Sequence, residues 1–170
     1  MTSQSTPDAG KLLDEASVDG VPIGPARPGK REKILVVDDQ PLILLDVGNH
    51  LSAAGYEVLG AMRLSDALDC LGKNLDIELV LSDVDFGDNT GITDLLKRTS
   101  GRQDLKFIVI TGWDDTSEKL KTLPPEMRAR VVEIIPKPFI GETIVAAVRQ
   151  ALAASMPSPA AASDRLPGPA

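Results

Sequence analysis

A chain of 170 residues is long enough for one well-buried domain with tails and too short for two comfortable domains. Apolar residues make up 42% and charged residues 25%, as in ordinary globular proteins, while the net charge of −7 argues against a nucleic-acid-binding surface. The single Cys70 excludes an internal disulfide, and no apolar stretch is long enough to span a bilayer or to form a signal-peptide core. We therefore expect a cytoplasmic protein that binds neither nucleic acid nor membrane.

The two ends of the chain differ in composition from the middle. Residues 1–32 mix Ser, Thr, Gly and Pro with charges, and residues 155–170 are mostly Pro, Ala and Ser. Neither end has enough apolar surface to offset the entropy lost on ordering. We therefore predict one domain over residues 33–154 between two disordered tails.

The domain begins with a strand that leads directly into two acids. Residues 33–37 form an apolar run suited to a parallel strand that is covered on both faces. Asp38 and Asp39 follow, and Pro41 suits the first turn of a helix. On their own, the two carboxylates fit the N-terminus of that helix. In an open α/β sheet, however, they also lie beyond the carboxyl ends of the strands, where such folds bind their ligands.

The helix after the acids carries an apolar band wider than one core-facing stripe. We predict this helix over Pro41 to Ala54, ended by Gly55. The outward part of the band, residues 42–45, is expected to form a surface for a partner protein. His50, the only histidine, is expected to face solvent on this helix rather than to carry a phosphoryl group.

Strands and helices alternate along the rest of the domain. The predicted elements are a strand at 56–60, a helix from Ser65 as its cap to Leu71, a strand at 77–82, a loop at 87–91, a helix ending near Arg98, a strand at 106–110, a strand at 131–135 and a helix at 140–154. Cys70 is expected to be a small core residue. This alternation predicts an α/β fold with a doubly wound, five-stranded parallel sheet and right-handed crossovers.

Polar residues follow four of the five predicted strands. They are Asp38 with Asp39, then Asp83, Thr111 and Lys137. Because the carboxyl ends of parallel strands meet at one edge of the sheet, we expect these side chains to converge there.

Three clustered carboxylates repel one another, and a divalent cation relieves that repulsion. Oxygen ligands from a few carboxylates suit Mg²⁺, which typically bridges them to a phosphate. The hydroxyl of Thr111 and the ammonium of Lys137 suit the remaining oxygens of a phosphoryl group. The simplest assembly makes Asp83 a nucleophile that accepts a phosphoryl group while the metal ion and Lys137 neutralise its charge.

The order and separation of these residues resemble the receiver domain of bacterial two-component response regulators, over about residues 33–154. The resemblance implies a flavodoxin-like fold and Mg²⁺ bound by Asp38, Asp39, Asp83 and the backbone carbonyl of Asp85. It makes Asp83 the phosphoacceptor and a sensor histidine kinase or a histidine phosphotransfer protein the donor. It also implies a signalling protein that acts on a downstream protein partner, not an enzyme.

The resemblance extends to the residues around the phosphoryl group. Thr111 would donate a hydrogen bond to the group, Lys137 would pair with it, and Gly112 would leave room for its entry. Pro138 would follow a cis peptide bond that places Lys137 in a tight turn.

Several positions depart from the usual receiver pattern. Gly87 replaces a common proline, and the acids of this loop, Asp85 and Asp88, are expected to make the pocket more anionic and its metal dependence stronger. Ile134 stands where many receivers have an aromatic residue that swings inward on activation, so that switch cannot operate in its usual form.

The segment between Thr111 and Lys137 is longer than usual. It contains Pro124 and Pro125, which predict a short or displaced helix. Residues 109–113 are similar to the Phe-Ala-Thr-Gly-aromatic signature of a subgroup of stand-alone receivers. Trp113 either replaces the missing switch aromatic or covers the pocket.

Two other readings are weighed against a stand-alone receiver that signals by contact or drains phosphate from a relay. Asp83-Val84-Asp85 also resembles the nucleophile motif of haloacid-dehalogenase-type phosphatases, in which the second acid is a general acid. That family places its acidic metal pair after the Thr and Lys, whereas Asp38-Asp39 comes first here. A pseudo-receiver that is never phosphorylated is disfavoured because every expected polar residue is present.

Overall fold

The computed structural model describes residues 31–87, 90–112 and 116–154. The C-terminal tail, almost all of the N-terminal tail, Asp88 and Trp113 therefore lie outside the described residues. Within these ranges, no helix is both long enough and apolar enough to cross a membrane.

Five parallel strands form the central sheet, in the order β2-β1-β3-β6-β7. They are β1 (Lys33–Val37), β2 (Glu57–Ala61), β3 (Ile77–Asp83), β6 (Lys106–Thr111) and β7 (Val131–Pro136). A two-stranded antiparallel hairpin of β4 (Asp85–Phe86) and β5 (Thr90–Gly91) follows β3. The strand order is that of flavodoxin-like folds, so the predicted doubly wound parallel sheet is confirmed.

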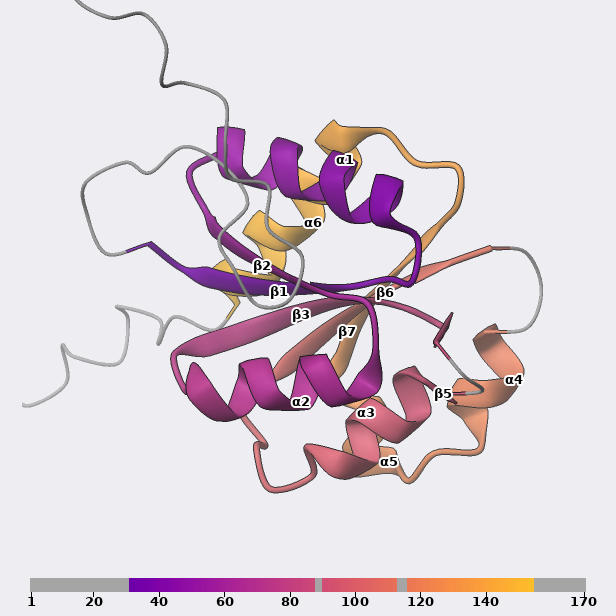
Figure 1. Ribbon diagram of the computed structural model, residues 1–170. Coiled ribbons are helices and arrows are strands. Elements are labelled where there is room, and N and C mark those ends of the chain that lie inside the picture. The colour runs from indigo at the N-terminus through magenta and orange to yellow at the C-terminus, as the bar shows by residue number, and fades with distance from the viewer. Residues whose placement is uncertain (1–30, 88–89, 113–115, 155–170) are drawn as a thin grey trace, which may run out of the picture.

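Helices cover both faces of the sheet (Figure 1). One face carries α1 (Pro41–Ala53) and α6 (Gly141–Ala153), and the other carries α2 (Leu64–Lys73) and α3 (Ile92–Arg98). The short helices α4 (Thr116–Lys121) and α5 (Pro125–Arg128) lie on the α2 and α3 side. Each helix side forms its own core with the sheet.

Alternate residues of the central strands enter different cores. In β1, Leu35 and Val37 pack toward α2 and α3, whereas Ile34 and Val36 pack toward α1 and α6. All four side chains are at most 1% exposed. Burial on both faces explains why these strands read as continuous apolar runs rather than as alternating patterns.

Two local predictions need correction. Ser65 does not cap α2, which begins at Leu64 after Arg63 as the N-cap residue. Leu64 packs against the core, which favours an earlier helix start, and the Ser65 hydroxyl donates to Asp66 instead. Within the predicted loop at 87–91, Gly87 has a φ of 69° and Thr90–Gly91 forms β5, while Asp88 and Asn89 lie outside the described residues.

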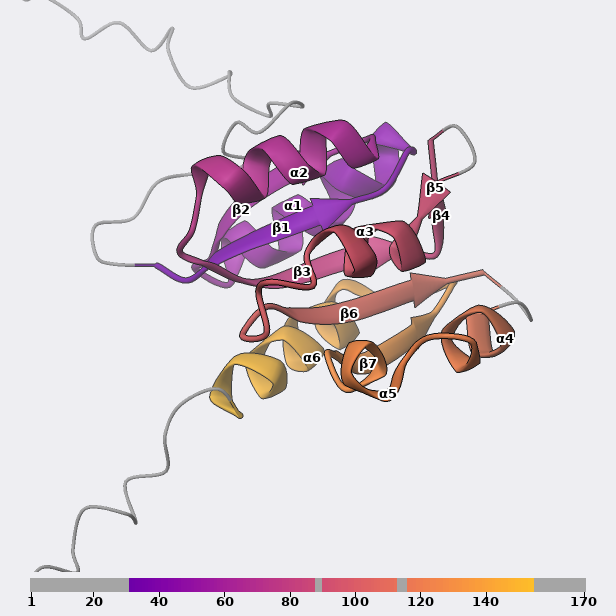
Figure 2. The ribbon, with the colours of Figure 1, turned by 90° about the horizontal axis from the view of Figure 1, so that it is seen from below.

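The short helices after β6 agree with the prediction from Pro124 and Pro125. α4 ends at Lys121, and α5 begins at Pro125 as its first residue. α4 lies near the carboxyl ends of the strands, while α5 lies below β7 (Figures 1 and 2). The edge strand β7 consequently leaves Val132 and Ile134 exposed, at 41% and 45%.

A buried arginine joins the end of α3 to the start of β7. Arg130 is 5% exposed, and its guanidinium donates to the carbonyl oxygens of Leu105 and Leu96 and to the Thr99 hydroxyl, at 2.9–3.1 Å. It also lies 4.9 Å from the ring centroid of Phe107. These contacts tie α3 to the sheet through carbonyl and hydroxyl acceptors and an aromatic ring.

His50 lies where α1 meets α6. Its side chain is exposed, as predicted, and its Nε2 is 3.6 Å from Asp46 Oδ1. The ring also covers Gly141, where a Cβ would lie 2.1 Å from His50 Nδ1. The contact requires glycine at the first residue of α6.

Candidate functional site

The register of the sheet brings the predicted residues to one edge. Val37 pairs with Ser82, and Asp83 pairs with Ile110, so Asp38 and Asp83 lie at the same level. Thr111 pairs with Pro136, directly before Lys137. The structure therefore confirms that four strand ends place their polar residues together.

Three carboxylates form a cluster at this edge. One oxygen each from Asp38, Asp39 and Asp83 lies within 4.8 Å of the others. Asp38 is buried, Asp83 is half-buried and Asp39 is exposed. The cluster is thus open on the Asp39 side and closed on the Asp38 side.

Lys137 is the cation at the buried side of the cluster. Its Nζ lies 3.1 Å from Asp38 Oδ2 and 3.2 Å from Asp83 Oδ2. Its backbone N–H donates to the carbonyl oxygen of Thr111, and the peptide bond to Pro138 is cis, as the resemblance implies. Burial alone would lower the pKa of Lys137, but the hydrogen bonds and charges of Asp38 and Asp83 outweigh it and raise this pKa.

Backbone amides orient the two buried acids. Asp38 Oδ1 accepts the N–H of Gln40 at 2.9 Å, and Asp83 Oδ1 accepts the N–H of Val84 at 2.8 Å. Their Oδ2 atoms consequently face Lys137. Burial is the largest cause of a raised pKa at Asp83; the nearby Asp38 charge adds to it, and Lys137 and the Val84 amide oppose it.

Thr111 lies at the end of β6, half-buried. Its hydroxyl donates to the carbonyl oxygen of Gly112 at 2.5 Å. A Cβ at Gly112 would have nothing within 4 Å, so the space expected beside Thr111 is present.

The Asp85 side chain does not join the acid cluster. Its Oδ2 lies 2.5 Å from Lys119 Nζ in α4, and the cluster found among the described residues contains the other three acids only. Lys119 thus pairs with the Asp85 carboxylate, and Asp88 lies outside the described residues, so the expectation of a more anionic pocket stays a prediction. Sequence reasoning missed Lys119, since no local pattern places α4 against β4.

A family model for the response regulator receiver domain matches residues 34–149 of the chain. The match covers the central sheet except for Lys33, and it includes both acids of the first loop. The chain belongs to this family. It is a receiver domain with the acid cluster, threonine and lysine at the strand ends.

Known proteins similar to this receiver domain include both regulators and solved structures. Response regulator MprA of Mycobacterium bovis is 33% identical over 131 residues, which cover 77% of this chain and 55% of that protein. A CheY-like receiver domain protein from Methanospirillum hungatei has a TM-score of 0.64 at 26% identity, covering 74% of this chain and 97% of that one. NtrX from Brucella abortus has the same TM-score and identity, but only 28% of its chain is covered. The receiver domain thus spans about half the length of the curated relatives it matches.

The charges of the receiver domain's acid cluster suit a divalent cation. Three ionised carboxylates and the one ammonium of Lys137 leave two net negative charges at the cluster. All donor atoms are hard oxygens, and the exposed Asp39 leaves an approach from solvent. Burial first, and then the neighbouring Asp38 charge, raise the pKa of Asp83 and disfavour its ionised form, an effect that a bound cation would oppose.

Proposed function

We propose that this receiver domain accepts a phosphoryl group on Asp83 from a phosphohistidine of a sensor histidine kinase or a histidine phosphotransfer protein. The observation that carries the proposal is the position of Asp83 Oδ2, 3.2 Å from Lys137 Nζ and within the cluster of three acids. A carboxylate with a fixed second oxygen and a cation beside it is a suitable acceptor for an electrophilic phosphorus.

The transfer balances without a further reactant. Asp83 Oδ2 attacks phosphorus, the phosphorus–nitrogen bond of the phosphohistidine breaks, and the imidazole leaves with the electron pair and takes a proton. The product is an acyl phosphate on Asp83. Lys137 is placed to neutralise charge on the transferred group, and Thr111, which follows the Ile110 that pairs with Asp83, would donate its hydroxyl to that group.

We assign Asp38, Asp39, Asp83 and the backbone carbonyl of Asp85 as the residues that hold Mg²⁺. When bound, the ion supplies positive charge that offsets the carboxylates and the phosphoryl oxygens. The side chain of Asp38 is already oriented for this by the Gln40 amide and by Lys137. Asp39 contributes from the solvent side.

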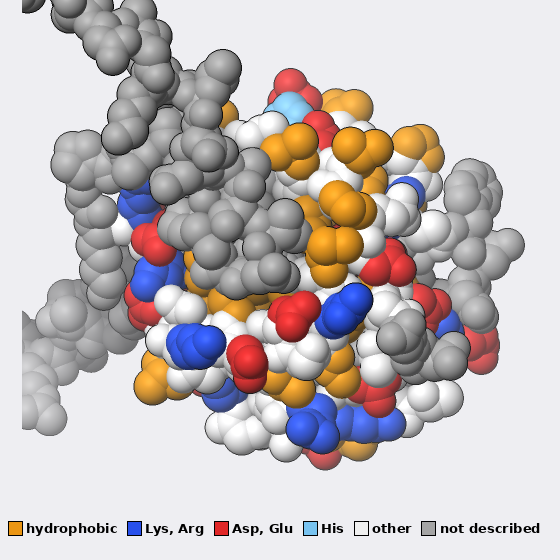
Figure 3. Space-filling view, viewed as in Figure 1, with side chains coloured by type: hydrophobic (Ala, Val, Ile, Leu, Met, Phe, Trp, Pro, Cys, Tyr) orange, Lys and Arg blue, Asp and Glu red, His pale blue; other side chains and the backbone are white. Residues whose placement is uncertain are grey.

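The donor is proposed to dock on the exposed apolar face of α1. Leu42 is 79% exposed and Leu45 40%, and Ile140 beside α6 is 65% exposed. Hydrophobic side chains gather over α1 in Figure 3. Because this face lies next to the strand ends that carry the acids, a protein docked there brings its phosphohistidine close to Asp83.

We further propose a domain over residues 33–154 that signals through a downstream protein or drains phosphate from a relay, in the manner of stand-alone receivers of the Phe-Ala-Thr-Gly-aromatic subgroup. The net charge of −7 favours protein partners over nucleic acid. We place the domain and these partners in the cytoplasm. The phosphatase reading is weaker, since Lys119 engages the Asp85 carboxylate that would have to act as general acid.

The test is phosphorylation of the purified protein by acetyl phosphate with and without Mg²⁺, followed by intact mass. We expect a hydroxylamine-labile adduct of one phosphoryl group that requires Mg²⁺ and is absent from Asp83→Asn. Asp104→Asn, an exposed acid paired with Arg102, is the matched control and should react like the wild type. If neither acetyl phosphate nor a phosphorylated histidine kinase gives the adduct, the phosphoacceptor proposal is wrong and the domain works by binding alone.

A further inference from the structure

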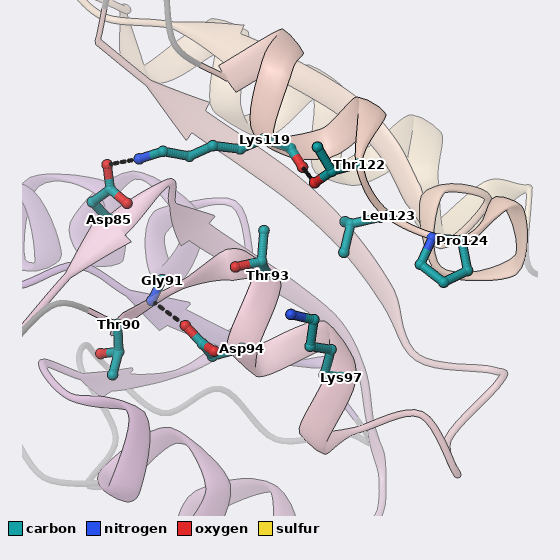
Figure 4. A pocket seen from close by; sticks show the side chains of 10 residues that line it. All are labelled: Asp85, Thr90, Gly91, Thr93, Asp94, Lys97, Lys119, Thr122, Leu123 and Pro124. Atoms are coloured by element: carbon teal, nitrogen blue, oxygen red, sulfur yellow. Dashed lines mark hydrogen bonds and ion pairs between the residues drawn. The ribbon is translucent and has the colours of Figure 1, made fainter.

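Asp85 is held by a lysine from a distant part of the chain. Lys119 Nζ lies 2.5 Å from Asp85 Oδ2, although the residues are 34 positions apart in sequence. Figure 4 shows the Lys119 side chain extended from α4 to Asp85. The pair borders a cleft of about 380 Å³ between the hairpin, α3 and α4.

The backbone of Asp85 is restrained as well. Asp85 pairs with Gly91 across the hairpin, and a Cβ on Gly91 would lie 2.3 Å from the carbonyl oxygen of Val84 and 3.2 Å from Asp85 Oδ1. The Gly91 N–H donates to Asp94 in α3 (Figure 4). The hairpin therefore restrains the main chain at Asp85, while Lys119 pairs with the carboxylate, whose side chain is 68% exposed.

We propose that Lys119 is a positioning residue of the metal site. It keeps the Asp85 carboxylate out of the acid cluster, so that Asp85 offers the site its backbone carbonyl and no additional charge. The inference rests on the proposed Mg²⁺ site. Its basis is the composition of the cluster, which joins Asp38, Asp39 and Asp83 but not Asp85, two residues further along the chain.

The consequence is a limit on metal affinity. A site with a fourth carboxylate binds Mg²⁺ more tightly, because oxygen-ligand sites gain affinity with ligand charge. The same added charge repels an anionic phosphodonor. By holding the Asp85 carboxylate, Lys119 thus balances metal binding against donor access without itself touching the metal or the donor.

The experiment measures the Mg²⁺ dissociation constant by isothermal titration calorimetry at about 10 mM ionic strength, where screening is weak. Lys119→Ala should bind Mg²⁺ about tenfold more tightly than the wild type, whereas Lys119→Arg, which keeps the charge, should stay within about twofold. Lys121→Ala is the matched control. It removes a cation and an exposed ion pair with Glu118 from the same helix, and its dissociation constant should change by less than about twofold.

The decisive comparison places Lys119→Ala in the Asp85→Asn background. Tighter Mg²⁺ binding by Lys119→Ala requires the released Asp85 carboxylate, so it should disappear in the Asp85→Asn background. If Lys119 and Asp85 acted on the ion independently, Lys119→Ala would change the dissociation constant equally in both backgrounds. The inference is overturned if Lys119→Ala resembles Lys121→Ala, or if it tightens binding equally with and without Asp85→Asn. If the wild type binds no Mg²⁺, the proposed metal site itself is wrong. If the wild type binds Mg²⁺ and Lys119→Ala binds it equally well, only the inference about Lys119 is wrong.

Discussion

Replacing Lys137 by methionine removes the ammonium that lies between the buried Asp38 and the half-buried Asp83. Asp38 is 1% exposed, and its Oδ2 is 3.1 Å from the ammonium, while Asp83 Oδ2 is 3.2 Å away. Removing one partner of a buried ion pair costs about 3–5 kcal/mol in the free energy of unfolding. We expect about 3 kcal/mol for Lys137→Met, at the lower end, because Asp83 already has a raised pKa and can take up a proton.

The Mg²⁺ dependence of this loss distinguishes the metal site from a structural ion pair. Urea unfolding would be followed in EDTA and at one Mg²⁺ concentration, about 100 times the dissociation constant of the wild type, where binding adds about 2.7 kcal/mol to the wild type. Because Lys137→Met lacks the ammonium that repels the ion, it should bind Mg²⁺ more tightly and gain more, so the loss that it causes should be smaller in Mg²⁺ than in EDTA. Lys121→Met, which breaks a pair exposed by 64% and 75%, should cost less than about 1 kcal/mol in either buffer. A Lys137→Met loss that is equal with and without Mg²⁺ would refute the reasoning.

Three further substitutions test other parts of the structure. The raised pKa means that Asp83 binds a proton more readily in the folded protein than in the unfolded chain. Its contribution to the metal-free free energy of unfolding should therefore fall as pH rises through the raised pKa. Urea unfolding in EDTA at several pH values should show this fall in the wild type and not in Asp83→Asn. Gly141→Ala should cost about 1–3 kcal/mol by urea unfolding through its clash with the His50 ring, and His50→Ala should relieve most of it in the double variant. Arg130→Met should lower the free energy of unfolding by about 2–4 kcal/mol, since three buried acceptors lose their donor; a loss below about 1 kcal/mol by calorimetry would contradict this account.

The sheet and the acid cluster could be predicted because both follow from position along the chain. An apolar run that ends in a polar residue places that residue at the edge of a parallel sheet, whatever covers the faces. Asp38, Asp83, Thr111 and Lys137 each follow such a run, and the structure brings them to one edge. Their roles in phosphoryl transfer remain predictions until the adduct is measured.

The contacts that the sequence did not predict are made by long side chains between distant elements. Lys119 reaches Asp85, and Arg130 reaches Leu96 across 34 positions, through groups that alone resemble ordinary surface charges. The helix start at Leu64 was missed for a related reason, because core packing outweighed the capping preference of Ser65. Such contacts depend on where two elements come together, which periodicity does not specify.

The contacts of the short helix α4 predict where a partner would detect phosphorylation of Asp83. Ile134 lies on the edge strand β7, 45% exposed, so it lacks both the ring and the enclosure of an inward-swinging aromatic switch. α4 is instead joined to the hairpin that follows Asp83 through the pair of Lys119 and Asp85, and it contacts the core through Leu120. We therefore expect a charge change at Asp83 to reach α4 through the hairpin rather than through β7. A partner that distinguishes the two states should consequently recognise α4 and the β4-β5 hairpin, rather than the exposed edge of the sheet.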